Sequence, residues 1–90
     1  MVEKTVEINN PVGLHARPAA IFVQTAGKFT SNIWLIRENK KVNAKSIMGI
    51  MSLAIPKGTV VTIRADGEDE ISAVDELVEL IESGFKEIDY

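Results

Sequence analysis

Cysteine is absent from this chain of 90 residues, and histidine occurs once, as His15. Without thiols the chain cannot build a disulfide framework, a thiolate zinc site or a thiol redox centre. A metal site would need carboxylates gathered around His15, whose sequence neighbours are Leu14 and Ala16. We therefore expect neither a metal nor a cofactor.

Long apolar stretches are absent as well. The longest nearly apolar run, residues 49–55, is far too short to cross a bilayer. Glu3 and Glu7 stand among the first residues, unlike the basic beginning of a signal peptide. These features predict a cytoplasmic protein that does not enter the membrane.

Basic residues are outnumbered, with ten Lys and Arg against 13 Asp and Glu, and the formal net charge is −3. Residues 1–45 hold seven basic and three acidic residues, a balance of +4, whereas residues 46–90 hold three basic and ten acidic residues, a balance of −7. An acidic chain without a dense basic run is a poor ligand for nucleic acid. The acidic side chains of residues 46–90 are best interpreted as the solvated face of a helix. The excess of positive charge in residues 1–45 suits an acidic protein partner.

Apolar residues make up 46% of the chain, which suits one compact domain over residues 1–90. Their spacing alternates between periods typical of strands and of helices. It predicts, in order, a strand over 2–8, a helix over 16–28, strands over 33–36 and 42–44 joined by a polar hairpin loop over 37–41, a short helix over 47–53, a strand over 59–65 and a helix over 71–81. The order β-α-β-β-α-β-α favours an α/β (α+β) fold, an open-faced β-sandwich in which three helices cover one face of a four-stranded sheet.

Two of these elements carry further detail. In the first strand, Lys4 interrupts the alternation of apolar side chains. The last helix is expected to bury a stripe at helical spacing and to end at Gly84, a residue suited to a C-terminal cap. The stripe comprises Ile71, Val74, Leu77, Val78 and Ile81.

His15 lies where the first loop gives way to the first helix, in the run Gly13-Leu14-His15-Ala16-Arg17-Pro18-Ala19-Ala20. Imidazole can accept and release a group near neutral pH, although a lone histidine at such a position is more often a surface or capping residue. First-turn N–H groups lack intrahelical partners and, with Arg17, would meet a phosphoryl group on His15. Because Pro18 disfavours a helical conformation at Arg17, we expect the regular part of the helix over 16–28 to begin only at Pro18, with His15 and Ala16 in a short loop before it.

Ser46 precedes the short second helix, where its hydroxyl is suited to the N-cap. The helix that follows carries Ile47, Met48 and Met51. Burial in the core is the plain interpretation of these three residues. A short helix cannot bury its whole circumference, however, and we expect part of the set to form a docking patch near His15, where the flexibility of methionine suits several partners.

Two motifs resemble those of the HPr family, the histidine-containing phosphocarriers of the bacterial phosphoenolpyruvate-dependent sugar phosphotransferase system. Residues 13–19, Gly-Leu-His-Ala-Arg-Pro-Ala, resemble the family's phosphorylation motif. Residues 45–53, Lys-Ser-Ile-Met-Gly-Ile-Met-Ser-Leu, resemble its regulatory serine segment in the form typical of low-GC Gram-positive bacteria. The chain departs from the family at Trp34 and in a slightly extended tail, Phe85 to Tyr90.

The resemblance implies a phosphoryl-group carrier in sugar transport rather than an enzyme. Enzyme I would pass a phosphoryl group from phosphoenolpyruvate to His15, through Nδ1, and the carrier would pass it on to sugar-specific IIA proteins or domains. Arg17 would stabilise the phosphoryl group. We expect a monomer whose partner-binding residues are Ala16, Ala20, Ile47, Met48 and Met51.

The resemblance also makes Ser46 the target of the ATP-dependent HPr kinase/phosphorylase. The serine-phosphorylated form would act as corepressor for a catabolite-control transcription factor, linking the carrier to carbon catabolite repression. A phosphate at a helix N-terminus is tolerated electrostatically, so this role is compatible with a cap.

Two other classes of function remain open. A small acylphosphatase-like enzyme would need a loop of backbone donors with a substrate-binding Arg and a water-orienting Asn, whereas the loop at residues 13–15 presents a histidine. A purely regulatory HPr-like module acting through Ser46 would lack that histidine. A paralogue with a mainly regulatory role is the remaining alternative.

Overall fold

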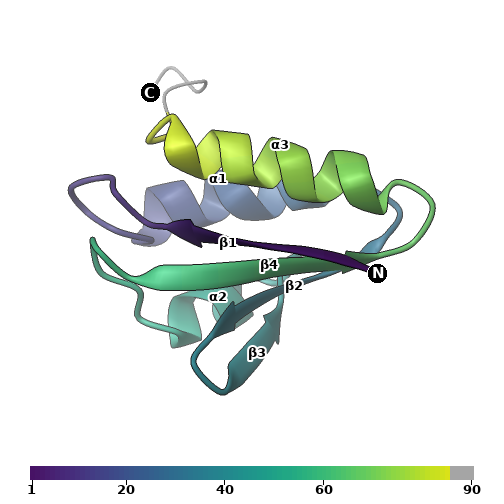
Figure 1. Cartoon of the computed structure of the whole chain (residues 1–90). Helices are drawn as coiled ribbons and strands as arrows, with labels where there is room; N and C mark the ends of the chain where they lie inside the picture. Colours follow the sequence, from purple (N-terminus) through teal and green to yellow (C-terminus); the bar gives the residue numbers. More distant parts are fainter. Residues whose placement is uncertain (86–90) are drawn as a thin grey trace.

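The computed structural model describes residues 1–85. Four antiparallel strands form one sheet in the order β1-β4-β2-β3, and the element order is the expected β-α-β-β-α-β-α (Figure 1). The open-faced β-sandwich predicted from the sequence is therefore confirmed. The elements are β1 (Val2–Glu7), α1 (Ala16–Ala26), β2 (Asn32–Arg37), β3 (Lys40–Asn43), α2 (Ile47–Ser52), β4 (Val60–Asp66) and α3 (Glu70–Glu82).

The sheet buries one of its faces. Central strand β4 pairs with β1 through Val6 and Val61 and with β2 through Leu35 and Ile63. Since successive strand residues point to opposite faces, these four side chains share the face that meets the helices, and all are buried. The neighbouring Trp34 lies on the other face, with the Lys41 ammonium nitrogen 5.4 Å from its ring centroid.

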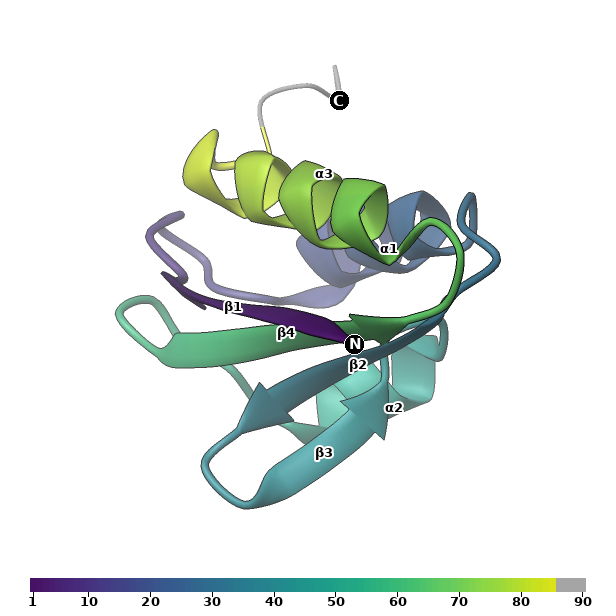
Figure 2. The same ribbon diagram turned by 45° about the vertical axis from the view of Figure 1, so that its right-hand side comes forward.

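Helices α1 and α3 run side by side along the buried face, and α2 packs against α1 and β3 (Figures 1 and 2). Phe22 of α1 and Leu77 of α3 are fully buried at this layer boundary. Removing such side chains from water is the main stabilising contribution to a domain of this size. The three helices thus close the core and leave the opposite sheet face open.

Lys4 lies on the helix-covered face of β1 although it is charged. Its ammonium nitrogen reaches Asp75 of α3 at 2.6 Å, and both side chains are about half exposed. The long stem of lysine can follow the apolar surface while the charge stays in water. The break in the apolar alternation is therefore a surface ion pair between β1 and α3.

The last helix differs from the expected stripe at its beginning. Ile71 is 63% exposed, so its assignment to the buried face was wrong; the buried positions are Ala73, Val74, Leu77, Leu80 and Ile81. The five buried positions cover one arc of the helix surface. With 100° per residue, Ile71 lies about 120° from the centre of that arc. Val78 is half-buried and packs against the core.

The C-terminus of α3 confirms the role expected of Gly84. This residue follows the C-cap Ser83 with a φ of +69°, and its N–H donates to the Ile81 carbonyl. The Phe85 N–H reaches back to the Leu80 carbonyl at 3.0 Å, and the Phe85 ring is fully buried. This is the Schellman arrangement, which ends a helix with an apolar contact. The remainder of the expected tail, residues 86–90, lies outside the described residues.

The β2–β3 hairpin is longer than the sequence indicated. Arg37 and Lys40 are paired strand residues, so the loop expected over 37–41 is reduced to Glu38 and Asn39. Glu38 takes a φ of +55°. Charged residues fit this hairpin because one face of its strands is open to solvent.

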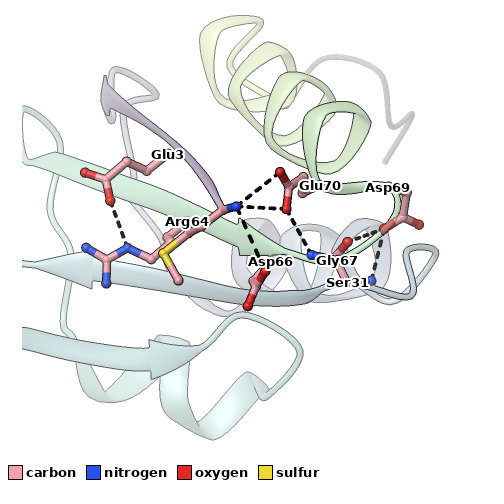
Figure 3. A network of polar contacts seen from close by, with 8 residues as sticks. Glu3, Ser31, Arg64, Asp66, Gly67, Asp69 and Glu70 are labelled. Atoms are coloured by element: carbon pink, nitrogen blue, oxygen red, sulfur yellow. Dashed lines mark hydrogen bonds and ion pairs between the residues drawn. The ribbon is translucent and has the colours of Figure 1, made fainter.

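A polar network joins the end of β4 and the start of α3 to the loop after α1 (Figure 3). The Asp69 carboxylate accepts hydrogen bonds from the Ser31 hydroxyl and from the N–H groups of Thr30 and Ser31. These bonds, the Ser31 hydroxyl first among them, lower the pKa of Asp69 to about 2. At Gly67 a side chain would collide with Ser31, so glycine permits the close approach of the two loops. Asp69 therefore ties two connections together instead of capping its own helix.

Within residues 1–85, none of the helices has the length and apolar character that a membrane span requires.

Candidate functional site

His15 is the N-cap of α1. Its backbone is extended, with φ −74° and ψ −174°, and its carbonyl accepts the first helical hydrogen bond from the Ala19 N–H at 2.9 Å. Its imidazole makes no capping hydrogen bond and is exposed. The local backbone thus presents the ring to solvent at the positive end of a helix.

Regular helix begins at Ala16, so the expectation that it begins at Pro18 was wrong. Pro18 is the third helical residue, where a missing N–H costs no intrahelical hydrogen bond. The steric preference against a helical Arg17 is a bias that the rest of the helix overrides. The Arg17 side chain is exposed on this first turn.

The loop before His15 rests on the segment that follows α2. The Leu14 N–H donates to the Ile55 carbonyl at 2.9 Å. Gly13 has a φ of +64°, and a Cβ there would overlap the Ile55 carbonyl and the Pro56 backbone. The Asn10 side-chain amide donates to the Gly13 carbonyl at 2.6 Å. These contacts fix the backbone that carries the imidazole.

A shallow cavity of about 300 Å³ lies beside the imidazole. His15 at the start of α1 and Met51 near the end of α2 both line this cavity, so the two helices meet here. Most of its wall is apolar. The lining residues are Leu14, His15, Met51, Ala54, Ile55 and Pro56.

Ser46 is the N-cap of α2, as predicted: its hydroxyl oxygen accepts a hydrogen bond from the Gly49 N–H at 3.1 Å. Burial of Ile47, Met48 and Met51 in the core is contradicted, since their exposed fractions are 40%, 80% and 42%. Ile50 supplies the buried contact of this helix. Six residues give only about 1.7 turns, so a single residue can face inward while the others remain at or near the surface.

The structure brings part of the expected partner-binding set together. Ile47 and Met51 are four residues apart on α2 and so share a face, and Met51 meets His15 at the cavity. Ala16 is exposed and Ala20 half-buried on α1, which packs against α2. Ser46 and His15 lie at the N-termini of these two packed helices.

Arg37 belongs to this region although the sequence placed it in a hairpin loop. Its Nη1 donates to the carbonyls of Leu53 and Ala54, each at 2.8 Å. Ala54, which lines the cavity beside His15, has a φ of +49°. No local pattern links residue 37 to residues 53 and 54, so only the folded arrangement reveals the contact.

Among the described residues, His, Asp and Glu form no group of three that could hold a metal ion.

Comparison with known proteins gives a consistent result. The family model described as "PTS HPr component phosphorylation site" matches residues 2–83. The HPr-like protein Crh of Halalkalibacterium halodurans is 55% identical over 82 residues, which cover 91% of this chain and 98% of that protein. The phosphocarrier protein HPr of Xylella fastidiosa (strain Temecula1) is 51% identical over 87 residues, covering 97% and 98%.

Solved structures agree with these relatives. HPr-C-His of Thermoanaerobacter tengcongensis is 62% identical, with a TM-score of 0.94 over 99% of this chain and all of that one. The crystal structure of Bacillus subtilis Crh, 52% identical with a TM-score of 0.75 over 93% and 97% of the two chains, is described as a dimer with a swapped domain.

Proposed function

Because the chain belongs to the HPr family of phosphocarrier proteins, we propose that it carries a phosphoryl group on His15 between enzyme I and sugar-specific IIA proteins. The observation that carries this proposal is the exposed imidazole at the N-terminus of α1, held there by the Leu14–Ile55 hydrogen bond. In this role residues 1–90 form one HPr-like phosphocarrier domain.

The transfer follows from the chemistry of imidazole. Nδ1 of His15 attacks the phosphorus atom held by enzyme I, and the bond from phosphorus to its donor atom on enzyme I breaks. In the second transfer the new P–N bond breaks as an acceptor on the IIA protein attacks. The protein supplies position and charge for both steps and is itself regenerated, so it is a carrier between phosphotransferases rather than an enzyme.

Arg17 is proposed to stabilise the phosphoryl group. Its guanidinium follows His15 by two residues on the exposed first turn of α1, and a guanidinium forms strong charge-assisted hydrogen bonds to phosphoryl oxygens. Such stabilisation matters most in the transition state, where charge moves between two proteins. The N–H groups at the helix end add to it.

Partners are proposed to dock on a patch that we define as Ala16, Ala20, Ile47, Met48 and Met51. Its support is the exposure of the α2 side chains and the meeting of Met51 with His15 at one cavity. Apolar side chains this exposed on a small protein favour contact with a partner. Enzyme I and the IIA proteins would use this one patch in turn.

Regulation is proposed at Ser46 by the ATP-dependent HPr kinase/phosphorylase. The Ser46 hydroxyl is half-buried and accepts the Gly49 N–H, so a phosphate there would lie at the N-terminus of α2 beside Ile47 and Met48. The modified protein would bind a catabolite-control transcription factor, with basic residues of that factor reading the phosphate. Titrating the factor with both forms of the domain tests this: equal affinities would leave Ser46 with its capping role alone.

One experiment decides the carrier role. The chain is incubated with enzyme I and phosphoenolpyruvate labelled in its phosphoryl group, and the label is then mapped. We expect acid-labile label on the peptide that contains His15 and its passage to an added IIA protein. Label that stays on enzyme I, or appears elsewhere on the chain, contradicts the proposal.

A mainly regulatory role is the second candidate, because Crh of Bacillus subtilis, described as a catabolite repression HPr, is 53% identical to this chain. The retained histidine at position 15 favours the carrier. The same labelling experiment separates the two, since a purely regulatory protein would take phosphate from the kinase at Ser46 and none from enzyme I.

We propose that the carrier is a cytoplasmic monomer. The swapped dimer described for Bacillus subtilis Crh gives the alternative assembly. Size-exclusion chromatography with light scattering separates the two, and a mass of twice 9.9 kDa at micromolar concentration would contradict the monomer.

A further inference from the structure

We infer that Arg37 is a positioning residue for His15. It holds the backbone of residues 53–55 in the turn on which the His15 loop rests. Arg37 lies in strand β2, outside the phosphorylation motif and not next to it in the sequence. The inference rests on the proposed function of His15, and its test is arranged so that the two can fail separately.

The first link joins Arg37 to the end of α2. The last carbonyls of a helix have no donor within the helix and carry the negative end of its dipole. Nη1 of Arg37 donates to the Leu53 and Ala54 carbonyls, both at 2.8 Å, just after α2 ends at Ser52. One guanidinium nitrogen therefore satisfies two successive carbonyls with charge-assisted hydrogen bonds.

The second link is the conformation of Ala54. Its φ of +49° belongs to the left-handed region, which a residue with a Cβ disfavours. The Ala54 N–H donates to the Met51 carbonyl at 3.1 Å, and its own carbonyl receives Arg37. Without the guanidinium, the turn would lose the bond on its carbonyl side and Ala54 would be free to relax toward a more favourable φ. A strained residue of this kind persists only where its surroundings hold it.

The third link runs from the turn to the imidazole. The residue after Ala54 is Ile55, whose carbonyl accepts the Leu14 N–H at 2.9 Å and lies against Gly13. Leu14 immediately precedes His15 in the chain, and Ala54 and His15 line the same cavity. A change of φ at Ala54 would redirect the Ile55 carbonyl and so move the support of the His15 loop.

The test compares Arg37→Gln with a matched control, Lys40→Gln. Lys40 is paired opposite Arg37 in the same hairpin, and its side chain is exposed. Each variant removes one positive charge from the hairpin, but only Arg37→Gln removes the bonds to Leu53 and Ala54. A loss of electrostatic attraction to an acidic partner would therefore affect both variants alike, and a loss of positioning only one.

Three quantities are measured in each variant: hydrogen exchange of the Leu14 amide, the NMR resonances of the one imidazole in the chain, and the saturation kinetics of phosphoryl acceptance from enzyme I. For Arg37→Gln we expect faster exchange, a shifted imidazole resonance and a maximal rate lower by about fivefold with little change in the half-saturating concentration, because geometry is lost while the patch remains. Lys40→Gln should match the wild type in all three.

Rescue completes the test. Ala54→Gly removes the strain that Arg37 counters, so adding it to Arg37→Gln should recover most of the rate and of the Leu14 protection. The double variant also keeps the inference testable if Arg37→Gln alone fails to fold. Equal effects of Arg37→Gln and Lys40→Gln, an unchanged Leu14 amide and imidazole in Arg37→Gln, or no rescue by Ala54→Gly would each overturn the inference. If the wild type accepts no phosphoryl group, the proposed function fails, while exchange and resonance still decide whether Arg37 positions His15.

Discussion

At the scale of single residues, exposure at His15 separates function from stability. An exposed side chain that makes no capping hydrogen bond contributes little to folding, so His15→Ala should change the free energy of unfolding by less than about 0.5 kcal/mol. The variant should accept no phosphoryl group from enzyme I. Urea unfolding and the labelling assay measure the two effects, and acid-labile label on His15→Ala would show that another group is the acceptor.

Arg17→Ala tests the charge beside the imidazole. The nucleophile remains, so acceptance should continue, but slower by about one to two orders of magnitude because transition-state charge loses its stabilisation. Arg17→Lys, which keeps the charge without the planar fork, should fall between the two. Rates in Arg17→Ala equal to those of the wild type would remove Arg17 from the mechanism.

Ala54 has a left-handed backbone conformation that a residue with a Cβ atom disfavours. Relief of its left-handed strain should outweigh the larger entropy of an unfolded glycine, so Ala54→Gly should raise the free energy of unfolding by about 0.5–1 kcal/mol. The same substitution in the helical interior, Ala20→Gly, should lower it by about 1 kcal/mol. Denaturant unfolding of both variants measures the contrast, and two changes of the same sign would contradict strain at Ala54.

At the scale of elements, Asp69 links the loop after α1 to the start of α3. Its pKa is lowered from 3.8 to about 2 in the folded protein, chiefly by the Ser31 hydroxyl. A carboxyl whose folded pKa is depressed contributes stability above its unfolded pKa, and that contribution is lost as pH falls through the folded value. Thermal unfolding should therefore show stability lost between about pH 4 and pH 2 in the wild type.

Asp69→Asn removes the titrating group and should flatten that part of the profile, at the expense of lower stability near neutral pH. Glu70 is the necessary comparison, because a hydrogen bond from the Gly67 N–H also lowers the pKa of its carboxyl. Glu70→Gln should leave most of the acid dependence in place if Asp69 is its main source. A profile for Asp69→Asn that is parallel to the wild type would contradict this assignment.

The elements themselves could mostly be predicted from the sequence, because each depends on local periodicity and on end signals such as Ser46 and Gly84. The errors arose where tertiary contacts override local preference. Pro18 fits inside the first turn of α1 once the helix is packed, and Ile71 falls outside an arc that only the position of the sheet defines. Arg37 bonds to carbonyls sixteen and seventeen residues away, and no local rule describes such a contact.

At the scale of the whole molecule, the sequence indicates one sheet with helices on one face but leaves the strand order open. The order β1-β4-β2-β3 depends on pairings such as Val2 with Ala65, between residues 63 positions apart in the sequence. The candidate site has the same character. Its motifs were readable one by one, whereas the shared cavity of His15 and Met51 exists only because α1 packs against α2.

The packing of α1 against α2 leads to a prediction about the two proposed phosphorylation sites. Ser46→Asp should slow acceptance at His15, because a charge beside the patch must be desolvated when enzyme I docks. Asp is as good an N-cap as Ser, so the free energy of unfolding should change by less than about 0.5 kcal/mol. The rate of acceptance and the midpoint of unfolding are the measurements.

Ser46→Ala is the opposite control. It loses the hydrogen bond from Gly49 and about 1 kcal/mol of stability, but it adds no charge and should leave acceptance at His15 unchanged. The two substitutions thus affect different quantities. A slower rate in Ser46→Ala would show that enzyme I depends on the cap, and an undiminished rate in Ser46→Asp would show that it does not respond to the charge.

The placement of Trp34 gives the molecule a built-in optical reporter. It is the one tryptophan in the chain, and it lies beside Lys41 on the sheet face turned away from the helices, whereas the proposed patch lies on α1 and α2. Its fluorescence should therefore change when the sheet unfolds and stay the same when His15 is phosphorylated or a partner binds at the patch. One fluorescence measurement can then show whether a variant has unfolded or has kept its fold and lost only the ability to bind a partner.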